Sequence, residues 1–261
     1  MTPRLFTDTA LTPGALIDLD ADRAHYLRDV LRLQSGAAVM LFNGRDGEWR
    51  SAIQDIRKRG ITLHVEAQIR HPVVEPDLWL CFAPIKKARL DFIAEKATEL
   101  GVRRLQPVIT QHTNVERVNI DRLRANATEA AEQTERLTVP EVVAPMTLPQ
   151  LVSGWPADRH MLLADETGGG RPVADVLAGL DEAARTAPWA VLTGPEGGFA
   201  RSELDLVGRL AHVHAVGLGP RILRADTAAL AALAVWQAIV GDWRQATPRR
   251  WPDYATSAKQ A

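Results

Sequence analysis

Residues 192–199 read Leu-Thr-Gly-Pro-Glu-Gly-Gly-Phe, and residues 216–228 read Val-Gly-Leu-Gly-Pro-Arg-Ile-Leu-Arg-Ala-Asp-Thr-Ala. Each stretch follows an apolar run that predicts a buried strand, and each leads toward a predicted helix. Glycine and proline in such loops let the backbone approach a ligand and hold a fixed turn. Because ligands of open α/β sheets bind at the carboxyl ends of strands, two such loops predict a ligand site at that edge.

Short apolar runs alternate with amphipathic segments through the last two thirds of the chain. The apolar runs predict strands at residues 78–83, 104–110, 160–164, 188–193 and 213–217. The amphipathic segments predict helices near residues 90–100, 121–137, 173–180, 202–210 and 227–240. This alternation predicts an α/β fold, a parallel sheet with helices on both faces.

Two of these helices carry further signals. Ser202 and Asp205 resemble a capping box at the start of the helix at 202–210. The last helix, at 227–240, is apolar on nearly every side, which predicts burial in the core or in a dimer interface. The polar residues from 243 onward predict a fraying tail.

Residues 1–72 have a different pattern. Short β candidates lie at residues 15–19, 37–42, 49–53 and 61–65, and turn residues separate them at 43–44, 46–47 and 59–60. Strands at this spacing predict a small β-barrel. One helix is predicted at 22–33, capped by Asp20 or Asp22. The two prolines within 71–76 indicate a linker between two domains.

The composition is that of an ordinary soluble globular protein. The chain has 261 residues, of which 46% are hydrophobic and 24% charged, with a net charge of −1. No apolar run reaches the length of a membrane span, and the N-terminus lacks a signal-peptide core, so we expect a cytoplasmic protein without a membrane partner. The single cysteine, Cys81, lies in an apolar run and is expected to be buried rather than nucleophilic.

Several common catalytic and cofactor motifs are missing. The chain has no Gly-x-x-x-x-Gly-Lys-Ser/Thr loop, no Cys-x-x-Cys pair, no His-Glu-x-x-His and no Gly-x-Ser-x-Gly. Residues 217–219 begin like a dinucleotide fingerprint, but the third glycine is absent. Nicotinamide and flavin cofactors are therefore disfavoured, and no metal site is predicted.

Charged groups elsewhere allow two interpretations. Lys86 and Lys87 lie at a predicted helix start, where cations oppose the helix dipole, so they are either solvated or bind phosphate. Glu129, Glu132, Gln133 and Arg136 share one helix, where ion pairing is the ordinary explanation. The loop at 165–171 holds two carboxylates and three glycines; a flexible loop is its ordinary explanation, and a role for the carboxylates stays open.

The two glycine-rich loops together resemble the signature of the RsmE family, ribosomal RNA uridine N3-methyltransferases with the SPOUT fold. The stretch His25-Tyr26-Leu27-Arg28-Asp29-Val30-Leu31-Arg32 with Gly36 resembles the family's N-terminal segment. Lys86, Lys87 and the stretches 96–102 and 129–133 resemble its middle segments. Asp226 stands where the family often has glutamate, and Glu135 where it often has glycine.

The resemblance implies a fold and partners. It implies a PUA-like, RNA-binding β-barrel over residues 1–72 and a SPOUT methyltransferase domain over 73–246, with a deep trefoil knot in its parallel sheet. Residues 247–261 would form the frayed tail. It further implies a homodimer, S-adenosyl-L-methionine bound in the knot, and a uridine of 16S ribosomal RNA in the small ribosomal subunit as substrate.

The resemblance also assigns residues to the site. The cofactor would be bound by Leu192, Thr193, Gly194, Pro195, Glu196, Gly197, Gly198, Leu218, Gly219, Ile222, Leu223 and Arg224. RNA would be bound by His25, Arg28, Arg32, Lys86, Lys87 and Arg136. Arg224, beside the cofactor loop, is our candidate catalytic residue, because a cation there could stabilise an anion on the uracil base. The general base stays open among Asp165, Glu166, Asp226 and solvent.

Three other functions remain as alternatives. A non-catalytic RNA-binding or ribosome assembly factor would bind no S-adenosylmethionine. A different α/β enzyme would use the loops for ATP or a dinucleotide. A SPOUT methyltransferase acting on another RNA would keep the chemistry and change only the target.

Overall fold

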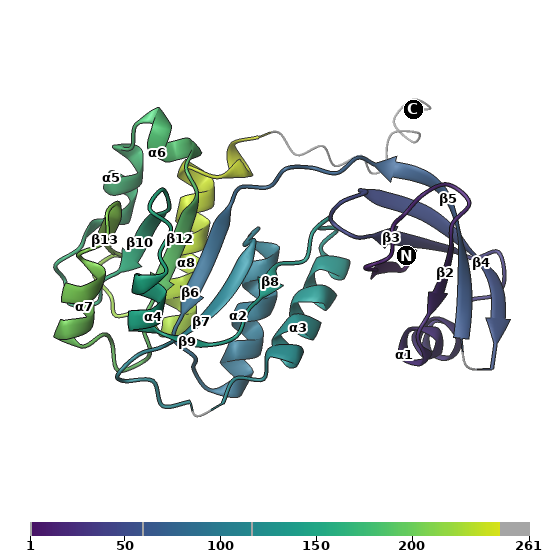
Figure 1. The fold of residues 1–261 in the computed structure, drawn as a ribbon, viewed down its shortest axis with the longest axis horizontal. Coiled ribbons are helices and arrows are strands. Elements are labelled where there is room, and N and C mark those ends of the chain that lie inside the picture. The colour runs from purple at the N-terminus through teal and green to yellow at the C-terminus, as the bar shows by residue number, and fades with distance from the viewer. Residues whose placement is uncertain (1, 59, 116, 246–261) are drawn as a thin grey trace, which may run out of the picture.

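The computed structural model describes residues 2–245, except 59 and 116, and forms two sheets joined by an extended segment (Figure 1). The predicted tail at 247–261 lies outside the described residues. Residues 71–77 run between the two sheets without regular secondary structure, where the linker is predicted. None of the helices in the described part of the chain combines the length and hydrophobicity needed to span a bilayer.

The N-terminal sheet is mixed. Its strands lie in the order β1 (Arg4–Phe6), β3 (Ala38–Phe42), β4 (Glu48–Arg57), β5 (Gly60–Arg70) and β2 (Leu16–Leu19). Strand β1 pairs parallel to β3, and the remaining pairs are antiparallel. The predicted turns at 43–44 and 46–47 are confirmed: Gly44 and Gly47 both have a φ of 78°, and a Cβ at Gly47 would overlap the carbonyl oxygen of Arg70. The turn predicted at 59–60 includes residue 59, which lies outside the described residues. Strand β1 was not predicted, because three residues are too few to show the alternation of buried and exposed side chains that marks a strand.

The predicted helix at 22–33 is shorter than expected. The α-helix α1 spans Ala21–His25 and continues as a single π-helical turn, η1, over Tyr26–Val30. The Asp20 side chain accepts a hydrogen bond from the backbone N–H of Arg23, so the predicted cap at Asp20 is confirmed. The helix ends early because Arg32 adopts a left-handed conformation with a φ of 55°.

The second sheet confirms the predicted parallel α/β layer. Its main path runs β11 (Arg171–Pro172), β13 (Val213–Gly217), β10 (His160–Ala164), β12 (Trp189–Thr193), β6 (Leu78–Phe82), β7 (Arg104–Ile109) and β8 (Glu141–Val142), and β9 (Met146–Thr147) pairs with β7. All of these strand pairs are parallel. Strands β8, β9 and β11 are two residues long, too short for a sequence pattern.

Helices cover both faces of this sheet, as predicted, because alternate strand residues point to opposite sides. Leu80, Leu162 and Val191 pack into one core with α2 (Lys87–Glu99), α3 (Ile120–Gln133), α5 (Val173–Ala178) and α8 (Ala225–Ile239). Their strand neighbours Cys81 and Leu163 pack into another with α4 (Leu148–Ser153) and α7 (Arg201–Val207). Two short helices, α6 (Glu182–Thr186) and the 3-10 turn η2 (Asp242–Arg244), complete the described chain.

One of the two helix predictions needs correction. Helix α7 begins after Ala200, whose backbone N–H donates to Glu203, so the predicted Ser202–Asp205 capping box is wrong. Ser202 lies inside the first turn instead. Helix α8 buries one side in the core, the side that carries Ala229, Leu233 and Trp236. Its other side is half-exposed in the single chain, so the predicted alternative of a dimer interface is not tested there.

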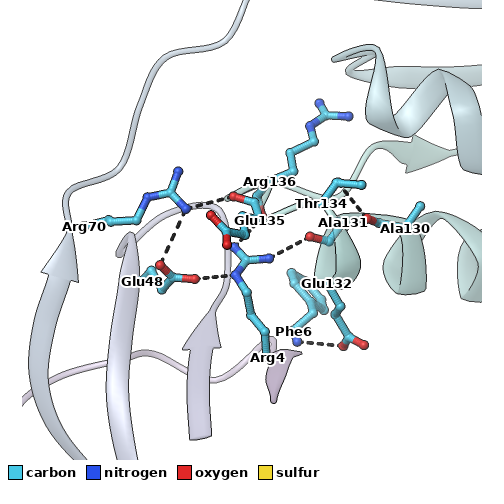
Figure 2. A network of polar contacts seen from close by, with 10 residues as sticks. All are labelled: Arg4, Phe6, Glu48, Arg70, Ala130, Ala131, Glu132, Thr134, Glu135 and Arg136. Atoms are coloured by element: carbon cyan, nitrogen blue, oxygen red, sulfur yellow. Dashed lines mark hydrogen bonds and ion pairs between the residues drawn. The ribbon is translucent and has the colours of Figure 1, made fainter. Parts of the chain in front are cut away.

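The end of α3 joins the two domains (Figure 2). The Arg4 guanidinium pairs with Glu48 and donates to the carbonyl oxygens of Ala131 and Arg136, each at 2.6 Å. The last carbonyl groups of a helix lack hydrogen-bond partners within the helix and carry a partial negative charge. A buried arginine supplies both the hydrogen-bond donors and the positive charge. The backbone N–H of Phe6 also donates to the Glu132 carboxylate at 2.9 Å. Glu132 thus joins the domains rather than taking part in ion pairing along the surface of its helix.

The turn after α3 explains why the family often has glycine at the position of Glu135. Glu135 follows the C-cap residue Thr134 and has a φ of 59°, the left-handed conformation that glycine usually supplies at this position. Its carbonyl oxygen accepts a hydrogen bond from Arg70 at 2.9 Å. A glycine in the corresponding family segment would adopt this conformation without strain.

Glu135→Gly is therefore expected to raise the free energy of unfolding by about 1 kcal/mol, because a side chain in the left-handed region costs roughly 1–2 kcal/mol. Urea denaturation measures the change. Glu129→Gly, inside α3, is the matched control and is expected to lower stability by about 1 kcal/mol. Equal losses in the two variants would contradict a strained turn at Glu135.

Candidate functional site

Three loops meet at the carboxyl edge of the sheet. Strand β10 lies between β12 and β13, and all three run parallel. The loops that follow them, residues 165–170, 194–200 and 218–224, therefore emerge at the same edge. The two glycine-rich stretches flank the loop after β10, which confirms the predicted common edge.

The first stretch offers mainly backbone to this edge. Leu192 and Thr193 are buried in β12, and Pro195 is buried just after it. Because these side chains are buried, only their peptide groups could reach a ligand. The Thr193 carbonyl already accepts a hydrogen bond from the Ala83 N–H at 3.0 Å. At Gly194 an added Cβ would lie 3.0 Å from the Phe199 ring, so a larger residue would displace that ring or the loop.

The turn at 197–199 is held by two neighbouring loops. The Glu166 carboxylate accepts a hydrogen bond from the Phe199 N–H at 2.7 Å. From the loop after β7, His112 Nδ1 lies 3.1 Å from the Gly197 oxygen and 3.0 Å from the Gly198 oxygen. Sequence reasoning did not single out His112. Its position just beyond a predicted strand of the same sheet was the available signal.

The second stretch presents apolar and cationic side chains. Leu218 and Leu223 are half-buried, whereas the Ile222 side chain is fully exposed. Gly219 has a φ of 101° with open space around it. Arg224 is the exposed N-cap residue of α8.

The three carboxylates considered as general bases all have partners. Asp165 accepts hydrogen bonds from the backbone and hydroxyl of Thr167. Glu166 holds Phe199. Asp226, in the first turn of α8, lies 3.9 Å from the Arg89 guanidinium and accepts a hydrogen bond from the Thr227 N–H. The loop around 165–170 is tightly built, since a Cβ at Gly170 would lie 2.5 Å from the Val216 carbonyl carbon.

The residues predicted to bind RNA lie in three different environments. His25, Arg28 and Arg32 lie on the N-terminal domain, and Figure 1 shows α1 far from the carboxyl edge of the second sheet. Arg28 donates to Asp29 and to the carbonyls of residues 57 and 58, and its hydrogen bonds, with those of His25, lower the pKa of Asp29 to about 2. Arg28 therefore fastens the π-helical turn to the β4–β5 hairpin.

Lys86 and Arg136, two more residues predicted to bind RNA, lie in different environments. Lys86 is exposed immediately before α2, at the same edge as the glycine-rich loops. Arg136 is buried, pairs with Glu75 at 2.5 Å and donates to the Thr98 carbonyl at 2.8 Å. The prediction that Arg136 contacts RNA needs correction, because its charge is neutralised inside the protein. The Lys87 side chain lies outside the described part of the structure.

A cavity of about 410 Å³ lies beside the loop after β10, on the α7 side. Leu163, Asp165 and Ala215 line it, and neither glycine-rich loop does. In the described part of the chain, no cluster of histidine, cysteine or carboxylate side chains has the arrangement of a metal site. Cys81 is fully buried, and burial raises the pKa of its thiol to about 12, as expected of a core residue rather than a nucleophile.

Comparisons with known proteins match this architecture. Residues 73–237 match an RNA methyltransferase domain, and residues 19–66 match an RNA methyltransferase PUA domain. The two matches define the class: an RNA methyltransferase domain preceded by a PUA domain.

Two curated relatives narrow the assignment. The ribosomal RNA small subunit methyltransferase E of Rickettsia conorii is 33% identical, over 88% of this chain and 93% of its own length. The enzyme of the same name from Synechocystis is 34% identical, over 87% of this chain and 74% of its own. The chain belongs to the ribosomal RNA small subunit methyltransferase E family.

Solved structures agree with the fold. The enzyme of this family from Neisseria gonorrhoeae, bound to S-adenosyl methionine, has a TM-score of 0.82 and 25% identity, over 93% of this chain and all of its own. The protein Lpg2936 from Legionella pneumophila, solved with bound S-adenosylmethionine, has a TM-score of 0.80 and 27% identity, over 93% of this chain and 99% of its own.

Proposed function

We propose that the chain transfers a methyl group from S-adenosyl-L-methionine to N3 of a uridine in 16S ribosomal RNA of the small subunit. One observation carries the proposal: two glycine-rich loops lie at one sheet edge, on either side of β10, in a chain of this family. Its relatives carry the name of a small-subunit RNA methyltransferase, and similar structures hold the methyl donor.

The loops fit the proposed cofactor. The sulfonium donor supplies an electrophilic methyl group, so the protein needs to bind and align rather than to provide a metal. The lack of a side chain at Gly194, Gly197 and Gly198 lets neighbouring protein groups pack against this loop, so the loop would offer its remaining peptide groups to the ligand. Leu218 and Gly219 would form the opposite wall. The exposed Ile222 side chain supplies an apolar surface for a flat base such as adenine.

The nucleophile is a uracil nitrogen that carries a proton at neutral pH. As that proton leaves, negative charge develops on the oxygens of the base, and a nearby cation lowers the energy of that state. Arg224 is exposed beside the cofactor loop and forms no ion pair with a carboxylate in the described part of the chain. We therefore assign the stabilising role to Arg224.

Arg224→Ala is expected to lower the turnover number about 100-fold, because removing one donor to a developing anion costs 10²–10³ in rate. Binding of S-adenosylmethionine, measured by calorimetry, should change by less than about threefold, since the guanidinium acts on the RNA base. Arg201→Ala, an exposed arginine on α7, is the control. Equal losses of binding and turnover would remove Arg224 from this role.

The target can be tested directly. Methyl-labelled S-adenosylmethionine is incubated separately with 16S RNA, small subunits and transfer RNA, and the product is digested to nucleosides. We expect label in N3-methyluridine from 16S RNA or from the subunit. No binding of the methyl donor would favour an assembly factor, competition by ATP would favour another nucleotide enzyme, and label in transfer RNA would indicate another SPOUT target.

We further propose that residues 1–72 form a PUA-like barrel that binds RNA and that 73–246 form the methyltransferase domain of a cytoplasmic enzyme. His25, Arg28, Arg32, Lys86 and Lys87 remain the proposed RNA contacts. The structure supports Lys86 best, because it lies beside the loops where the uridine would enter.

A trefoil knot is the proposed path of the chain end. Strand β13 joins the sheet beyond β10, and α8 then returns to pack against β12 and α2. The buried Gln237 side chain of α8 donates to the Leu100 carbonyl at 2.7 Å, which fastens this returning helix to the end of α2. Stretching the unfolded chain from both ends would test the path, because a tightened knot leaves it shorter than an unknotted chain of the same length.

A homodimer is proposed from the exposed apolar surface of α2 and α8. The Phe92 side chain is 41% exposed on α2, the helix that packs against α8. Phe92→Asp is expected to shift the protein toward monomer in sedimentation equilibrium, because a charge would be buried in the contact. Val74→Asp is the control, because the Val74 side chain is fully exposed in the linker, and it should leave the assembly state unchanged. A wild-type monomer at all concentrations would contradict the proposal.

A further inference from the structure

The turn at 197–199 lies between two loops that come from opposite sides. Glu166 follows β10, which pairs with β12 on one side, and His112 follows β7, which lies beyond β6 on the other. Both side chains bond to the backbone of the turn rather than to other side chains there. The conformation of the turn therefore depends on two residues distant in sequence.

Glu166 holds the turn through an N–H group. Its Oε1 accepts from the Phe199 N–H at 2.7 Å, and a hydrogen bond to a charged acceptor is stronger than one between neutral groups. The carboxylate lies so close to the chain that a Cβ at Gly198 would overlap Oε1. Gly198 also has a φ of 69°, which a side chain would strain.

His112 holds the same turn through carbonyl groups. A carbonyl oxygen only accepts hydrogen bonds, so the contacts of Nδ1 with the Gly197 and Gly198 oxygens require a proton on Nδ1. The turn therefore selects the tautomer of His112. An added Cβ at Gly197 would lie 3.1 Å from the His112 Cβ, so glycine is needed for this approach too.

We infer that His112 and Glu166 are positioning residues that hold the glycine-rich loop in its cofactor-binding conformation. One donates to the two carbonyls of the turn and the other accepts the N–H that follows them. With these groups occupied, the remaining backbone of the loop is fixed before a ligand arrives, which lowers the entropy lost on binding. The inference rests on the proposed function, because it assigns roles around the proposed cofactor site.

The inference also separates Glu166 from the role of general base. A carboxylate that only accepts a hydrogen bond from the Phe199 N–H can be replaced by an amide, whose oxygen accepts the same bond. A carboxylate that accepts a proton during catalysis cannot be replaced in this way. Likewise, asparagine places an N–H donor near the position of Nδ1 in His112 without supplying a basic nitrogen.

Four variants test the inference: His112→Ala, Glu166→Ala, His112→Asn and Glu166→Gln. Each alanine variant is expected to weaken S-adenosylmethionine binding about tenfold by calorimetry, which corresponds to about 1.4 kcal/mol. The asparagine and glutamine variants should bind within about threefold of wild type and keep their turnover numbers. The double alanine variant should lose less than the product of the single effects, because both residues hold one turn. Glu182→Ala, on the exposed face of α6, is the control.

Several results would overturn the inference. Alanine variants that bind the methyl donor normally would show that the loop needs no such support. A Glu166→Gln variant that binds normally but has lost turnover would make Glu166 a base instead, and the same result in His112→Asn would make His112 one. A loss of thermal stability that matches the loss of binding in every variant would indicate only a folding role.

A second measurement keeps this test independent of the proposed function. Amide hydrogen exchange at the Phe199 N–H should be slow in wild type and in Glu166→Gln, and faster in Glu166→Ala, with or without the methyl donor. If wild type binds no S-adenosylmethionine, the proposed function fails, and exchange still decides whether Glu166 holds the turn. Unchanged exchange in Glu166→Ala would contradict the inference whatever the cofactor.

Discussion

The parallel pairing of β10 between β12 and β13 is the constraint on which the site depends. Two loops separated in sequence by a helix and a strand, α7 and β13, can form one pocket only if their strands end at the same edge. The pairing also brings the loop after β10 between them, so that Glu166 reaches the backbone of Phe199. A different strand order would leave both glycine-rich loops intact and the site absent.

The second constraint is the joint at the C-terminal end of α3. Arg4 crosses from the first strand of the N-terminal domain to carbonyl oxygens of the second domain, and Glu48 balances its buried charge (Figure 2). Removing one partner of such a buried pair typically costs 3–5 kcal/mol, so the joint holds one relative orientation. Any RNA that binds both domains therefore contacts a surface whose shape depends on the contacts at the end of α3.

The sequence-based predictions succeeded where a period or a turn signal was long enough. The alternating runs predicted the main strands of the second sheet and placed α2, α3, α5, α7 and α8 within a few residues. The short helices α4 and α6 were not predicted, because five or six residues are too few to show a helical period. They failed for β8, β9 and β11, which are two residues long, and for the helix that the left-handed Arg32 shortens. The prediction that Arg136 contacts RNA failed for another reason. Its partner Glu75 is 61 residues away in the chain, and no local sequence pattern indicates that pair.

The sequence by itself determined the α/β class, the two glycine-rich loops and, through its family resemblance, the proposed methyl donor and RNA substrate. These follow from local residue patterns and from motifs that can be recognised by their spacing along the chain. Only the tertiary structure decided which side chains surround the loops. His112, Glu166 and Arg136 acquired their partners from strand order and domain contact, because hydrogen bonds depend on atoms brought within about 3 Å and not on separation along the chain.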